Sequence, residues 1–142
     1  MTTNTYDDIK ESIAPELARL HEAIHHTLKS SSNPLLNTVV ESYLQSKGKL
    51  IRPILVILTA RLFGDVSDKV IASASAVEML HNASLIHDDV VDESKMRRGA
   101  PTINAVWDNH IAVLVGDFFE AGALSQAVSV SYTHLTLPTN RE

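Results

Sequence analysis

Apolar side chains recur every three or four positions along most of this chain, which is the spacing of helices that bury one face. Pro15 falls inside the first such stretch and is expected to begin a second helical segment there. Strand-like alternation is absent, so the pattern predicts an all-α protein whose helices pack into a bundle. The helices are predicted over residues 7–29, 35–45, 51–63, 66–93 and 103–128.

The composition indicates the size of the domain and excludes several kinds of site and partner. The chain has 142 residues, 44% of them hydrophobic, which is enough for one ordinary domain with a core. A formal net charge of −5 argues against a nucleic-acid partner bound through overall basicity, and the lack of cysteine excludes a thiolate metal site or a cysteine nucleophile. Charged side chains interrupt residues 1–20, and the apolar runs at 54–58 and 111–115 are too short to span a bilayer. We therefore expect a cytoplasmic protein without an integral membrane segment.

Three carboxylates gather near the end of the helix predicted over residues 66–93. At about 100° per residue, Asp88, Asp89 and Asp92 fall within one arc of that helix. Like charges at a helix C-terminus oppose the helix dipole, and a cation would relieve them. Oxygen ligands of this kind suit Mg²⁺, which completes its shell with water and phosphate oxygens. A solvated acidic helix end is the alternative, but the apolar sequence on the N-terminal side of the cluster favours a metal site.

Basic side chains follow and precede that cluster. Arg97 and Arg98 come just after the predicted helix end, where they can also compensate the helix dipole. Lys49 and Arg52 stand at a predicted helix N-terminus, whose free N–H groups favour anions. His81 lies two turns before the carboxylates on the same helix face, although a lone histidine is more often a core residue than a ligand. Two basic clusters and one acidic cluster together indicate a site for two phosphorylated substrates and Mg²⁺.

The motifs at these positions are those of a known family. Gly48-Lys49-x-x-Arg52-Pro53, the run from Glu78 to Gly99, and Gly116-Asp117 match its motifs in content, order and spacing. Over about residues 10–128 the chain resembles the trans-prenyl diphosphate synthases of the polyprenyl synthetase family. The resemblance implies the N-terminal portion of an isoprenoid-synthase-type helical bundle, and a homodimer for the full-length parent.

The resemblance also implies a reaction and a set of roles. The family condenses isopentenyl diphosphate with an allylic prenyl diphosphate: the allylic C–O bond ionises, the isopentenyl double bond attacks, and a proton is lost. Asp88 and Asp92 are implied to bind Mg²⁺ that bridges to the allylic diphosphate, with Asp89 supporting and Arg97 contacting that diphosphate. The diphosphate of isopentenyl diphosphate is implied to bind Lys49, Arg52, His81 and Arg98.

Two small residues just before the acidic cluster bear on product length. The resemblance implies that bulk at Ala83 and Ser84 limits how far the product grows. Small side chains there predict an open tunnel and a product longer than farnesyl. Phenylalanine at either position is expected to shorten the product of the complete enzyme, and an unchanged product would contradict this.

The C-terminal part departs from the family. Relatives are about twice as long and carry a second Asp-rich motif, whereas this chain has no acidic cluster after Asp92. Residues 131–142, which are Thr-rich and include Pro138, are predicted to abandon helical character and to be foreign to the family. We therefore divide the chain into a truncated synthase domain at 1–130 and a non-family tail at 131–142. The chain alone is expected to lack prenyl transfer activity.

Two other functions stay open on the sequence. A metal-dependent phosphohydrolase could use His87 and Asp88, but it would need further histidines converging on the same ion. A non-catalytic helical subunit would need none of the charged motifs. Mg²⁺-dependent diphosphate binding separates that subunit from a synthase.

Overall fold

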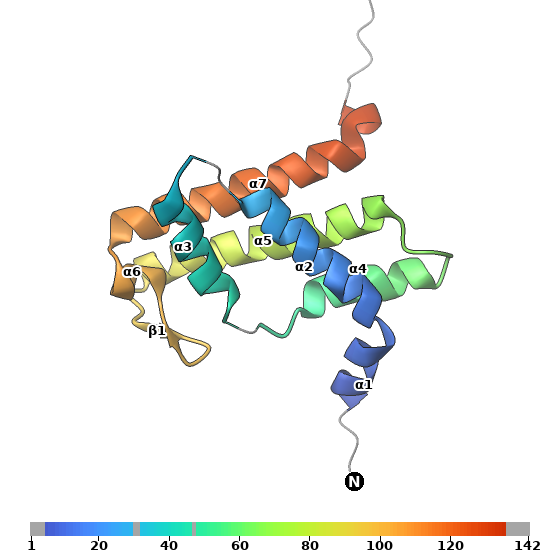
Figure 1. The fold of residues 1–142 in the computed structure, drawn as a ribbon, viewed down its shortest axis with the longest axis horizontal. Helices are drawn as coiled ribbons and strands as arrows, with labels where there is room; N and C mark the ends of the chain where they lie inside the picture. Colours follow the sequence, from blue (N-terminus) through green and yellow to red (C-terminus); the bar gives the residue numbers. More distant parts are fainter. Residues whose placement is uncertain (1–4, 30–31, 47, 136–142) are drawn as a thin grey trace, which may run out of the picture.

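The computed structural model describes residues 5–29, 32–46 and 48–135, and the side chains up to residue 130 (Figure 1). It confirms the all-α prediction for this part of the chain. The helices are α1 (Thr5–Ser12), α2 (Ala14–Leu28), α3 (Pro34–Leu44), α4 (Ile51–Arg61), α5 (Asp68–Val91), α6 (Ile103–Val106) and α7 (Asn109–Leu135). Two short strands, β1 (Met96–Arg97) and β2 (Ala100–Pro101), lie between α5 and α6.

The long helices α5 and α7 lie side by side and form the centre of the fold, with α2 packed across them (Figure 1). Phe119 of α7 and Met79 of α5 are fully buried between these helices and their neighbours. The Tyr43 ring of α3 meets Phe119 edge-on, with 5.4 Å between the ring centroids. Burial of each large apolar side chain contributes about 1.5–3 kcal/mol, so this core fixes the position of α5.

The helix boundaries follow local capping. Ser67 accepts a hydrogen bond from the Val70 N–H at the start of α5, and Asn33 accepts one from the Leu36 N–H at the start of α3. The predicted interruption near Pro15 is present: α1 ends at Ser12, and the proline occupies the first turn of α2.

The segment predicted as one helix over 103–128 is two helices. The short α6 ends at Val106, and Trp107 has non-helical backbone angles. The carboxylate of Asp108 then accepts a hydrogen bond of 2.8 Å from the Ile111 N–H and starts α7. Sequence periodicity missed this break because an aspartate cap restarts the helix after only two residues.

The predicted absence of strands is wrong at one place. Met96 pairs with Pro101, and Arg97 with Ala100, in a small antiparallel hairpin. Arg98 and Gly99, with φ of 53° and 76°, form its turn, and positive φ at both central residues is the type I′ geometry. Strands of two residues are too short to show alternation in a sequence.

The predicted loss of helical character from residue 131 is also wrong for 131–135, because α7 continues to Leu135. The chain has no glycine or proline between Gly122 and Pro138, so no residue type there breaks the backbone hydrogen bonds. Residues 136–142 of the predicted tail lie outside the described part of the chain.

Helix α7 also bears on the membrane expectation. The stretch Asn109–Val130 is 22 residues long and apolar enough to cross a membrane by length and composition. The apolar run at 111–115 therefore belongs to a longer apolar stretch than the one considered in the sequence analysis. A core helix of a folded domain passes the same test, and α7 packs along α5.

Candidate functional site

The predicted acidic cluster lies at the C-terminal end of α5. Asp88 and Asp92 are one turn apart and both are exposed. The Asp92 N–H bonds to the Asp88 carbonyl at 2.8 Å, and Glu93, with φ of 53°, ends the helix. Two carboxylates on one exposed helix turn can share a hydrated cation.

Asp89 faces a different environment from the other two carboxylates. Its side chain is only 5% exposed, and both of its oxygens accept hydrogen bonds from Arg97, at 2.8 Å from Nε and 2.7 Å from Nη2. This contact raises the pKa of Arg97, with a further contribution from the charge of Asp89. A rotation of about 100° from Asp88 takes Asp89 onto the buried face of α5, so the arc of three carboxylates divides into an exposed pair and a buried one.

The β1–β2 hairpin folds back over this end of α5. The Ser94 N–H donates to the Asp89 carbonyl at 2.9 Å, and Asn104 Nδ2 donates to the carbonyls of both Asp89 and Ser94. These bonds, together with the bidentate Arg97–Asp89 pair, hold the hairpin on the helix end. The hairpin turn is thereby directed toward the loop before α4.

That turn carries Arg98 onto the glycine of the predicted anion-binding loop. A Cβ added at Gly48 would lie 2.7 Å from Arg98 Nη1, so a side chain there would displace the guanidinium from its present position. Lys49 follows directly, Leu50 has a left-handed backbone with φ of 54°, and Arg52 lies in the first turn of α4. The fold thus places Arg98 beside the loop that carries Lys49 and Arg52, although these two residues lie 46 or more positions earlier in the sequence.

His81 lies within the field of these cations. Its pKa is lowered, first by partial burial and then by the positive charges of Arg52, Arg98 and Arg97. Arg52 and His81 line one groove of about 390 Å³, together with Glu120 of α7. The positive charges that act on His81 favour an anionic ligand beside it.

Ala83 and Ser84 line the same groove but differ in packing. Ala83 is 2% exposed and belongs to the core, whereas Ser84 is exposed and its hydroxyl donates to the His81 carbonyl at 2.8 Å. Added bulk at position 84 extends into the groove, whereas added bulk at position 83 meets the core as well.

A buried polar network that the sequence did not single out lies beneath Arg98. Asn82 Nδ2 donates to the Glu78 carbonyl at 2.9 Å and to Glu78 Oε1 at 3.3 Å, and the Tyr43 hydroxyl donates to Asn82 Oδ1 at 3.2 Å. Burial raises the pKa of Tyr43 to about 12, which keeps its hydroxyl protonated as a donor. With Gly48 and Arg98, these side chains line a cavity of about 270 Å³. In the sequence, the i, i+4 spacing of Glu78 and Asn82 was the feature that could have predicted their hydrogen bond.

The free energy of unfolding is expected to fall as pH rises, because the buried Glu78 carboxyl becomes charged. Replacing Glu78 with glutamine is expected to remove this fall. Burial raises the pKa of Glu78 above its ordinary 4.5, against the opposing effects of Asn82 and of Arg98 and Arg52. The folded state therefore binds the proton more tightly, so the free energy of unfolding falls as pH rises from 4.5 through the raised pKa. Glutamine keeps the Oε1 acceptor and has no charge to bury.

Urea titrations from about pH 4 to about pH 8 measure this difference. The exposed Glu22→Gln change on α2 is the matched control and should leave the pH dependence unaltered. Parallel pH curves for Glu78→Gln and the unmodified chain would contradict the expectation.

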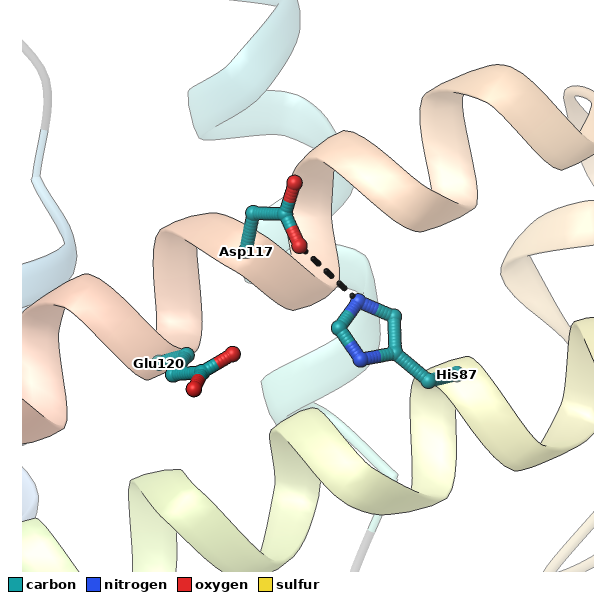
Figure 2. A group of neighbouring side chains, drawn as sticks. All are labelled: His87, Asp117 and Glu120. Carbon is teal, nitrogen blue, oxygen red and sulfur yellow. Dashed lines mark ion pairs between the residues drawn. The ribbon is translucent and has the colours of Figure 1, made fainter.

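His87 faces α7 rather than the acidic end of α5. Its Nε2 lies 3.2 Å from Asp117 Oδ1 and 3.2 Å from the Val113 carbonyl, with Glu120 one turn further along α7 (Figure 2). Its neighbours among the described side chains that could hold a metal are carboxylates, not the further histidines that a phosphohydrolase at His87 and Asp88 would need.

Comparisons with known proteins agree on one family. A sequence model of the family described as polyprenyl synthetase matches residues 33–140. An all-trans-nonaprenyl-diphosphate synthase (geranyl-diphosphate specific) of Rhodobacter capsulatus is 40% identical over 131 residues, which are 92% of this chain and 40% of that protein. An octaprenyl diphosphate synthase of Escherichia coli is 39% identical over 87% of this chain and 38% of its own length.

Solved structures give the same result. A decaprenyl diphosphate synthase from Rhodobacter capsulatus superposes with a TM-score of 0.83 at 36% identity, over 87% of this chain and 38% of that one. A polyprenyl synthase from Caulobacter crescentus, solved with calcium and isoprenyl diphosphate, gives 0.81 at 33% identity over the same shares of the two chains. This chain therefore spans about two fifths of the length of these relatives.

Proposed function

Because the chain belongs to the polyprenyl synthetase family, we propose that it forms the N-terminal part of a synthase that joins isopentenyl diphosphate to an allylic prenyl diphosphate. The observation that carries the proposal is the β1–β2 hairpin. It holds Arg97 at the acidic end of α5 and Arg98 on the Gly48 loop, so two cationic groups for two anionic substrates lie side by side. The rival functions leave this pairing unexplained.

The site around the Gly48 loop would hold the diphosphate of isopentenyl diphosphate. Arg98 lies against Gly48, and Lys49 and Arg52 continue from the loop into α4. His81 shares the positive field of Arg52 and Arg98. Guanidinium groups bind phosphate oxygens in a bidentate manner, and the free N–H groups of the first turn of α4 add further donors.

The acidic end of α5 would hold the allylic diphosphate through Mg²⁺. Asp88 and Asp92 fit this metal, because they offer only oxygen ligands, are exposed, and leave positions for water and phosphate. When bound, Mg²⁺ neutralises charge that develops on the departing diphosphate. Asp89 supports the site by holding Arg97, which would contact the same diphosphate from the hairpin.

In the proposed reaction the allylic C–O bond breaks and its electron pair leaves with the diphosphate. The isopentenyl double bond then attacks the allylic carbon, and a proton is lost from the isopentenyl part. Arg97 would stabilise negative charge on the leaving group, while the Gly48 loop and Arg98 would orient the attacking substrate. The scheme requires no protein nucleophile.

The complete activity is proposed for a polypeptide that also supplies a second acidic cluster, which the sequence after Asp92 does not contain. We expect the 142-residue chain to bind diphosphates without turnover. The homodimer and the product longer than farnesyl are likewise proposed for the longer polypeptide.

Calorimetric titration of the 142-residue chain tests the proposal. Arg98→Ala is expected to weaken binding of isopentenyl diphosphate about tenfold or more, since a hydrogen bond to a charged group is worth about 1.5–3 kcal/mol. Mg²⁺ should strengthen binding of an allylic diphosphate, and either EDTA or Asp88→Ala should remove that increase. Arg97→Ala should likewise weaken binding of the allylic diphosphate.

Arg61→Ala is the matched control, because Arg61 pairs with Glu16 and contacts the Ser12 carbonyl in another part of the fold. It should leave both affinities unchanged. Diphosphate binding that is independent of Mg²⁺ and equally strong in Arg98→Ala would favour the non-catalytic helical subunit.

A further inference from the structure

We propose that His87, Asp117 and Glu120 form a second metal site, distinct from the acidic end of α5, that binds a borderline divalent transition ion such as Zn²⁺ and links α5 to α7. One imidazole nitrogen and one oxygen from each carboxylate lie within 4.8 Å of one another. Figure 2 shows the imidazole of α5 directed between the two carboxylates of α7. The proposal does not depend on the proposed synthase function.

The spacing of one ligand pair suits a tetrahedral ion. Two ligands each about 2.1 Å from Zn²⁺ lie about 3.4 Å apart at the tetrahedral angle. His87 Nε2 and Asp117 Oδ1 are 3.2 Å apart, and Glu120 is one helical turn from Asp117 on the same face of α7. The three ligand atoms lie within 4.8 Å of one another, so binding an ion requires the Glu120 carboxylate to move closer and His87 Nε2 to release the Val113 carbonyl. Three protein ligands leave the fourth position for water.

The ligand chemistry separates this site from the one at Asp88 and Asp92. An oxygen-only set suits Mg²⁺, whereas an imidazole shifts the preference toward zinc and its neighbours in the transition series. His87 and Asp117 have side chains 32% and 60% exposed, so an ion can reach them from solvent. Asp117 and Glu120 are like charges at i, i+3, and a divalent cation would relieve their repulsion.

Gly116 provides an independent observation at the same place. This buried glycine on α7 lies so close to His87 that a Cβ there would overlap the imidazole ring. The missing side chain lets the ring approach the backbone of α7 and reach Asp117. The Gly116-Asp117 pair, which the sequence offered only as a family motif, therefore has a local structural role.

Zinc titration of the 142-residue chain by calorimetry, and Co²⁺ substitution followed by visible absorption, test the site. One saturable Zn²⁺ is expected at this site, with affinity unaffected by excess Mg²⁺. His87→Gln and Asp117→Asn should each lower the affinity for Zn²⁺ at least tenfold. Gly116→Ala should also lower this affinity, although it leaves all three ligands in place. Alanine is the better helix former, so this last variant should keep its helical content.

Two controls locate the ion. His25→Gln tests zinc bound by the His21 and His25 pair of α2, and Asp88→Asn tests zinc bound at the acidic end of α5. Both should leave the affinity within twofold of the unmodified chain. Absence of saturable binding, equal affinity in His87→Gln, or a loss confined to His25→Gln or Asp88→Asn would each overturn the proposal.

Discussion

Replacing Asp89 with alanine is expected to lower the free energy of unfolding by about 2–3 kcal/mol at pH 7. The Asp89 side chain is 5% exposed and accepts two hydrogen bonds from Arg97, so the change leaves a guanidinium without its anion. Breaking a fully buried pair costs roughly 3–5 kcal/mol, and the 29% exposure of Arg97 places this pair below that range. Urea denaturation followed by helical circular dichroism measures the loss.

A double-mutant cycle with Arg97→Ala identifies the cause. If the pair carries the effect, the two substitutions together should cost clearly less than the sum of their separate costs. Asp65→Ala, at an exposed loop position before α5, is the matched control and should change stability by less than about 0.5 kcal/mol. Strict additivity of Asp89→Ala and Arg97→Ala would show that the bidentate contact does not hold the hairpin.

Phenylalanine at position 83 is expected to destabilise the chain by about 1–3 kcal/mol, because it adds a ring to a packed core. Ala83 is 2% exposed and lies on the side of α5 that contacts the core. Ser84→Phe, one position along, is the matched comparison. Its side chain is exposed in the groove, so we expect a change within about 0.5 kcal/mol. Thermal unfolding of the two variants measures the difference.

This difference decides how product length should be tested. In the complete enzyme both variants are predicted to shorten the product, but only Ser84→Phe does so without an expected loss of stability. Equal destabilisation by the two variants would mean that position 84 is also packed. The exposed position is therefore the better test of the tunnel hypothesis.

Periodicity was sufficient for the main helices. The predicted helix at 66–93 is α5 to within two residues at each end. In the structure Ser67 caps its start, and Glu93, which has a left-handed backbone, ends it. The helix predicted at 35–45 is α3 to within one residue. The predictions failed where the local backbone conformation of a few residues ends a helix or turns the chain. These places are the break before Asp108 and the hairpin turn of Arg98 and Gly99.

The sequence by itself determined the helical class, the family, and the order of the acidic and basic motifs, because these depend on residue types at fixed spacing along single helices. Only the tertiary structure decided which of those residues are buried and which are exposed. It buried Asp89 against Arg97 while leaving Asp88 exposed, since the hairpin covers one side of the helix end and not the other. It also brought His87 to Asp117, across 30 positions, through the packing of α5 on α7. Contacts between helices depend on how the core orients each face, which no periodicity within one helix records.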